Sequence, residues 1–88
     1  MDGATYYWQG IKVTSYFIDV TAVKHPEIFA LPERIAEALT HPSWVQLQSN
    51  GWTRRWVWAP ELDHHIRVIV LADRETVHNA FVDRGFTP

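Results

Sequence analysis

The chain of 88 residues contains no cysteine, which excludes disulfide bonds and thiolate metal sites. It also contains no stretch approaching the ~20 consecutive apolar residues that a membrane-spanning helix needs. Its first residues lack a basic region followed by an apolar run, so we expect no signal peptide and a cytoplasmic protein without membrane contact. A chain of this length predicts a single domain, residues 1–88.

Basic residues are few, since eight Lys and Arg stand against ten Asp and Glu for a net charge of −2. Because phosphate neutralisation supplies most non-specific affinity for nucleic acids, this balance argues against a strong non-specific binder. A small positive cleft is still compatible with it. Five arginines lie in the C-terminal half: Arg54, Arg55, Arg67, Arg74 and Arg84.

Catalytic motifs of high specificity are also missing, including a glycine-rich phosphate loop, G-x-S-x-G and H-E-x-x-H. His64 and His65 are adjacent, so on a strand their side chains would point to opposite faces. We expect them in a solvated hairpin turn and not on a metal. The sequence therefore predicts no cofactor.

The C-terminal third predicts three consecutive antiparallel strands, at 52–58, 66–72 and 76–81. The middle strand is apolar at almost every position, as expected of a strand covered on both faces. Residues 60–63 and 73–75 are short polar breaks of hairpin length. This region is the folding unit around which the rest of the chain is organised.

The first half is less uniform. Residues 6–14 predict a strand with a kink or turn at Gly10. The β-branched residues of 15–24 favour a strand, but a helix with Ser15 as its N-cap fits as well. A helix would place four side chains on one face: Tyr16, Phe17, Val20 and Val23.

Residues 32–40 form a clear amphipathic helix, with a proline at its first position and a proline shortly after its end. A strand at 44–47 and a turn at 49–51 follow. The order predicts an α+β fold, in which two short N-terminal helices pack on a four- to five-stranded, mainly antiparallel sheet. The second face of the sheet would form a shallow cleft or a surface for a partner.

The word His25-Pro26-Glu27 is the first candidate site. A histidine is a general acid or base near neutral pH, and a neighbouring carboxylate can orient it. The alternative is that His25 satisfies the last carbonyls of a helix and that Glu27 is solvated.

His78 and Asn79 are polar residues in an apolar strand, and alternation predicts that they face opposite ways. One of them either donates to a developing charge or is a hydrogen-bonded structural group. Arg54 and Arg55 also alternate in facing. Arg67 interrupts the most apolar strand, and it would clamp a phosphate or pair with a carboxylate of Glu61, Asp63 or Glu75.

Trp52, Trp56 and Trp58 share one face of their strand by period two. Tryptophans so placed form either part of the core or a platform on which single-stranded RNA stacks.

Taken together, several stretches resemble small domains of the barnase/EndoU/colicin/RelE superfamily, particularly its phage- and mobile-element-associated branches. The resemblance rests on 11–14, His25-Pro26-Glu27, the helix at 32–40 with Pro42, the Trp/Arg-rich strand, the apolar strand 66–71 and Asn79-Ala80-Phe81. It favours a helix at 15–24, which we therefore predict.

The resemblance implies a metal-independent ribonuclease of toxin type, paired with a cognate antitoxin, or a relative that has kept the fold and lost the chemistry. His25 would be the acid or base, and Arg55 or Arg67 would clamp the phosphate. Asn79 stands where related domains often carry Ser or Thr. The chain departs from the pattern at Asp19 and Val20, near which related domains often carry another histidine.

Two readings without catalysis stay open. The Trp-rich strand or an exposed sheet edge would hold another protein as a partner. A homodimer through the tryptophan face is the third arrangement.

Overall fold

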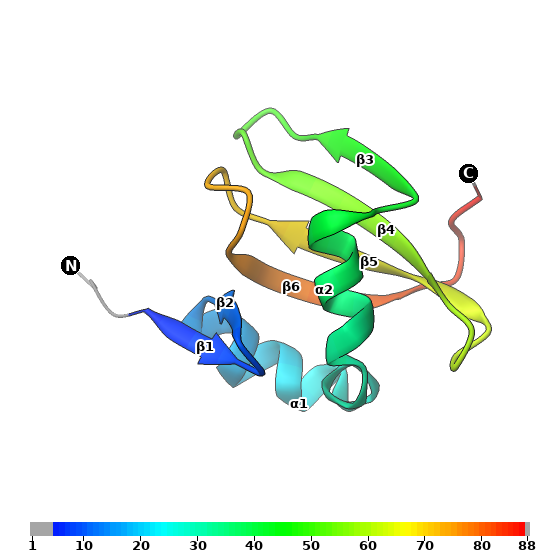
Figure 1. Cartoon of the computed structure of the whole chain (residues 1–88), viewed down its shortest axis with the longest axis horizontal. Helices are drawn as coiled ribbons and strands as arrows, with labels where there is room; N and C mark the ends of the chain where they lie inside the picture. The colour runs from blue at the N-terminus through cyan, green and yellow to red at the C-terminus, as the bar shows by residue number, and fades with distance from the viewer. Residues whose placement is uncertain (1–4, 88) are drawn as a thin grey trace.

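The computed structural model describes residues 5–87 and confirms the α+β class (Figure 1). Its strands are β1 (Tyr6–Trp8), β2 (Ile11–Val13), β3 (Trp44–Leu47), β4 (Thr53–Ala59), β5 (His64–Val70) and β6 (Val77–Asp83). Its helical segments are the π-helix η1 (Phe17–Thr21), α1 (Ala22–Lys24), the 3-10 turn η2 (Pro26–Ala30) and α2 (Pro32–Thr40). Within this described part, no helix is both long and apolar enough to cross a membrane.

One mixed, mostly antiparallel sheet contains all six strands in the order β1-β2-β6-β5-β4-β3. The predicted meander from β3 to β6 is confirmed, and β2 joins it in parallel beside β6. The expected four or five strands become six because residues 6–14 fold as a hairpin of two strands. The chain reverses at Gln9 and Gly10, both at positive φ, which glycine adopts without steric cost.

The predicted helix at 15–24 is confirmed, with helical backbone throughout and a π-helical centre. Its N-cap differs from the expectation. The hydroxyl of Thr14 accepts a hydrogen bond from the Phe17 N–H at 3.2 Å, so Thr14 and not Ser15 caps the helix.

The face that this helix buries also differs from the prediction. Phe17 and Thr21 are fully buried, whereas Val23 is 76% exposed and Tyr16 lies at the surface. The buried residues are four apart, a spacing that places two side chains on one face of a helix, and the expected apolar set did not include Thr21 because it is polar.

Helix α2 lies across one face of the sheet, in front of it in Figure 1. It buries Ile35 and Ala38 against Val57 of β4 and, with the η1 and η2 segments, closes the hydrophobic core. The alternate residues of the sheet point to the other face, which α2 does not cover. We name this surface the open face, and its residues are Trp44, Gln46, Arg54, Trp56, Trp58, His65, Arg67, Ile69, His78, Asn79, Phe81 and Asp83.

His78 and Asn79 lie together on the open face, contrary to the prediction that they face opposite ways. Val77 pairs with Val70 and Ala80 with Val68, and all four are fully buried. In a regular strand, two residues that face the same side are separated by an odd number of residues, but Val77 and Ala80 are separated by two. The strand therefore carries a β-bulge there. The bulge places both intervening side chains on one side.

The tryptophans of β4 belong to the open face and not to the core beneath α2. Trp58 is 42% exposed, so of the two alternatives it is not a core residue. Trp56 is buried, but by stacking on Phe86 and beneath Arg67, on the side away from the helix. Arg55 and Val57 alternate with them and point toward α2.

Candidate functional site

The side chain of Phe81 connects the helical segment to the centre of the open face. The His25 ring lies 5.8 Å from the Phe81 ring, measured between centroids, and the guanidinium carbon of Arg67 lies 5.1 Å from the same ring. His25 follows α1, where its backbone leaves the helical conformation at φ −133°. A titratable imidazole and a guanidinium therefore flank one aromatic ring.

Glu27 accompanies His25, as the His-Pro-Glu word suggested. Its Oε2 lies 3.9 Å from His25 Nδ1, which is a distance for charge attraction and longer than a hydrogen bond. The 3-10 turn η2 begins at Pro26 and fixes the backbone between the two residues. Glu27 thus lies beside the Nδ1 edge of the His25 ring and leaves the Nε2 edge unobstructed by that carboxylate.

Asn79 is held in one orientation by two hydrogen bonds to its side-chain oxygen. The hydroxyl of buried Thr21 donates to Asn79 Oδ1 at 2.7 Å, and the Ala80 N–H donates to the same atom at 2.9 Å. Since Oδ1 is occupied, the amide NH₂ is the group that faces outward, and no acceptor within residues 5–87 engages it. Asn79 is therefore a fixed donor on the open face.

Arg67 pairs with Asp83, a partner that differs from all three carboxylates considered from the sequence. Its Nη2 and Nε lie 2.8 and 3.0 Å from Asp83 Oδ2, and Trp56 Nε1 donates to the same oxygen at 2.9 Å. Burial alone would raise the pKa of Asp83, but the hydrogen bonds from Trp56 and Arg67 and the charge of Arg67 outweigh it and lower that pKa. The guanidinium also lies over Trp56 and Phe81, so it is rigidly placed.

Arg55 lies on the opposite side of the sheet from Arg67. Its Nη1 donates to the Leu39 carbonyl at 3.1 Å and to the Ala38 carbonyl at 3.4 Å, at the C-terminal end of α2. Burial, and the charge of Arg74, lower the pKa of Arg55. Arg55 thus caps a helix, as cations near helix C-termini often do, and it does not join His25.

His78 is packed between two aromatic rings next to Asn79. It stacks on Tyr16 at 4.6 Å, lies 5.0 Å from Trp52, and its Nδ1 is 3.2 Å from the Thr14 hydroxyl. Burial lowers its pKa below the ordinary value and so favours the neutral ring. His78 therefore has a structural environment beside the site.

The paired histidines occupy the start of β5 and not a turn. His65 contacts Trp58 and Phe86 edge-on, while His64 Nε2 lies 3.0 Å from Arg84 Nη1. The described residues contain no group of three His, Cys, Asp or Glu that could hold a metal ion.

Sequence reasoning missed Asp83, Phe81 and Thr21 as site residues. Asp83 lay beyond the predicted end of its strand, and only strand register could have identified it as the partner of Arg67. Thr21 was missed because it is polar and so gives no signal in a pattern of apolar residues, although it lies four residues after the buried Phe17.

The site thus combines an imidazole with a carboxylate, a rigid guanidinium and a fixed amide donor, on the face of the sheet that carries the Phe81 ring. Such a set can exchange a proton and stabilise a phosphate without a metal. Comparisons of the chain with protein-family models, curated proteins and solved structures found no match.

Proposed function

We propose that the open face binds single-stranded RNA and that His25, Arg67 and Asn79 support its metal-independent cleavage. The observation that carries the proposal is the arrangement around Phe81, with the His25 ring and the Arg67 guanidinium both beside it. Asn79, two residues earlier on β6, presents its amide donor on the same face. These groups are 54 residues apart along the chain, from His25 to Asn79, and are brought together only by the fold.

In this proposal the ribose 2′-hydroxyl loses its proton to His25, and its oxygen bonds to the adjacent phosphorus. The P–O5′ bond breaks, and the departing 5′-oxygen takes a proton from water. Arg67 and the Asn79 amide stabilise the charge on the phosphorane. The products are a 2′,3′-cyclic phosphate and a 5′-hydroxyl end.

RNA is held chiefly by stacking, because cations are few on the open face. Asp83 already neutralises Arg67, while Trp44 and Trp58 offer exposed rings. Stacking on aromatic side chains tolerates any base and is worth ~1–3 kcal/mol per base.

The proposal is tested by incubating the purified protein with single-stranded RNAs in excess EDTA and analysing the ends of the products. We expect cyclic phosphate ends, and a loss of rate of about 10²–10⁴-fold for His25→Ala. His41→Ala, at an exposed histidine after α2, is the matched control and should cleave normally. Intact RNA with the native chain, or full activity of His25→Ala, would overturn the proposal.

A second function is favoured by a separate observation. Strand β3 is an apolar edge of the sheet, exposed along its whole length, which suits a protein-interaction module.

A further inference from the structure

Strand β3 ends the sheet and is exposed on both of its faces. Trp44 is 53% exposed, Val45 48% and Leu47 68%, and no strand within residues 5–87 pairs with its outer side. Natural edge strands usually carry charges, prolines or bulges that prevent pairing with another chain. The four residues of β3 carry none of these, so the edge is open to a further strand.

The backbone groups on the outer side of β3 follow from its register. Gln48 N–H donates to the Trp52 carbonyl at 2.8 Å, and Gln46 is opposite Arg54. Hydrogen-bonded and non-hydrogen-bonded pairs alternate along an antiparallel ladder. The N–H and C=O groups of Val45 and Leu47 therefore point away from β4, where another strand would bond to them.

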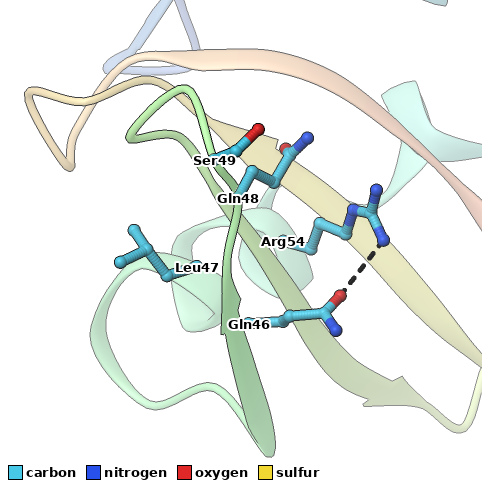
Figure 2. A pocket seen from close by; sticks show the side chains of 5 residues that line it. All are labelled: Gln46, Leu47, Gln48, Ser49 and Arg54. Atoms are coloured by element: carbon cyan, nitrogen blue, oxygen red, sulfur yellow. Dashed lines mark hydrogen bonds between the residues drawn. The ribbon is translucent and has the colours of Figure 1, made fainter.

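A polar hollow of about 240 Å³ lies beside this edge, lined by Gln46, Leu47, Gln48, Ser49 and Arg54 (Figure 2). The Arg54 side chain extends from β4 to β3, where Nη1 donates to Gln46 Oε1 at 3.1 Å. No carboxylate of the described chain pairs with Arg54. Gln48 Oε1 is buried and accepts no hydrogen bond from any described residue. The hollow thus holds a cation without an anion.

We propose that β3 binds an extended segment of a partner protein as a seventh strand, whose side chains alternate between apolar and acidic. The apolar side chains would pack beside Val45 and Leu47, and a carboxylate on the other face would pair with Arg54. Figure 2 shows Leu47 pointing away from the side on which Gln46 and Arg54 lie, as this alternation requires. Backbone bonding gives affinity and the two faces give specificity.

Charge distinguishes this partner from a second copy of the chain. Neither β3 nor the other sheet edge, β1, contains an acidic residue, so self-association through either edge would leave Arg54 without a carboxylate. The proposal is independent of RNA cleavage, because it uses none of His25, Arg67 and Asn79.

The test uses fluorescein-labelled peptides of alternating Val and Glu, and matched peptides of alternating Val and Lys, followed by fluorescence anisotropy. We expect the glutamate peptide to bind and the lysine peptide to bind at least about tenfold more weakly. Arg54→Gln should weaken the glutamate peptide about tenfold. The control Arg74→Gln, at an exposed arginine of the β5–β6 turn, should not weaken it.

Val45→Pro removes an outward N–H while leaving the bonds of Gln46 and Gln48 to β4, so it should abolish binding in a folded protein. Should Val45→Pro not fold, methylating alternate backbone nitrogens of the peptide provides the same test. Methylation of the nitrogens that face β3 should abolish binding, and methylation of the nitrogens that face away from β3 should not. Absence of binding at ~1 mM glutamate peptide, a typical ceiling for weak recognition, would overturn the proposal. So would equal binding of both peptides, indifference to every backbone block, or a dimer formed through β3.

Discussion

At the residue scale, Asp83 is the group on which the arrangement of the open face depends most. It accepts hydrogen bonds from Arg67 and Trp56 on one oxygen, and its side chain is only 13% exposed. Removing its charge would leave a half-buried guanidinium without its anion, which costs more than losing an exposed ion pair. The carboxylate therefore determines where Arg67 stands.

We predict that Asp83→Asn lowers the free energy of unfolding by about 1–3 kcal/mol at pH 7. The control Asp19→Asn, at an exposed carboxylate of η1, should change it by less than about 0.5 kcal/mol. Urea unfolding followed by tryptophan fluorescence measures both. An Asp83→Asn protein as stable as the native chain would show that the ion pair contributes nothing.

The same carboxylate predicts a pH dependence. Because the pKa of Asp83 lies below its ordinary value of 3.8 in the folded state, its ionised form stabilises the protein. This contribution is fully present above that value and is lost as the pH falls through the lowered pKa. The stability difference between the native chain and Asp83→Asn should be constant above about pH 5 and shrink at lower pH. A difference that grows in acid would contradict the assignment.

At the element scale, the contact between η1 and β6 connects the His25 corner to the sheet. Its polar part is the bond from Thr21 to Asn79, inside an otherwise apolar contact. Asn79 lies on the open face in regular register with Ile69, and the β-bulge at His78 directly precedes it.

Thr21→Val keeps the shape of the side chain and removes the hydroxyl, so we predict a loss of about 0.5–2 kcal/mol. For a domain of this size, each kcal/mol corresponds to a fall in Tm of about 4–8 °C in thermal unfolding. Thr40→Val, which removes an exposed hydroxyl that donates to the Ala36 carbonyl in α2, is the control and should leave Tm nearly unchanged. Equal Tm values for the native chain and Thr21→Val would show that the hydrogen bond from Thr21 to Asn79 does not contribute to stability.

Periodicity and turn chemistry predicted most of the elements. The helix at 32–40 and the strand at 44–47 have the predicted bounds, because proline at the helix start and Ser49-Asn50-Gly51 after the strand are local signals. Within 6–14 the position of the turn at Gly10 was predicted, but β-propensity alone does not distinguish a kink in one strand from the reversal that makes a hairpin of two.

The site was less predictable than the elements, because local sequence patterns do not show which strands pair or in what register. His25, Glu27, Arg67 and Asn79 do lie around one corner of the open face, but Arg55 does not. The facing of His78 required knowledge of a bulge, and the partner of Arg67 required a long-range register. Neither leaves a signal in the local sequence.

At the scale of the whole molecule, the net charge of −2 constrains how RNA is held. Each phosphate contact to a single strand contributes about 0.7 to the slope of log affinity against log salt concentration. Because the cations of the open face are few, we predict a shallow slope, no steeper than about −2. Trp58→Ala should weaken binding without changing the slope, as loss of a stacking ring would. Anisotropy titrations at several salt concentrations measure this slope. A slope typical of six or more phosphate contacts would contradict stacking as the main source of affinity.

Binding of RNA to the open face can be observed directly by a ¹H–¹⁵N NMR titration with a 2′-O-methyl RNA of about six nucleotides, which lacks the attacking hydroxyl. We predict shifts of the indole signals of Trp56 and Trp58 and of the backbone signals of His25, Asn79 and Phe81. The indole of Trp8, buried in the core, and the signals of α2 should stay in place. Shifts confined to α2, or an unchanged spectrum at saturating RNA, would contradict it.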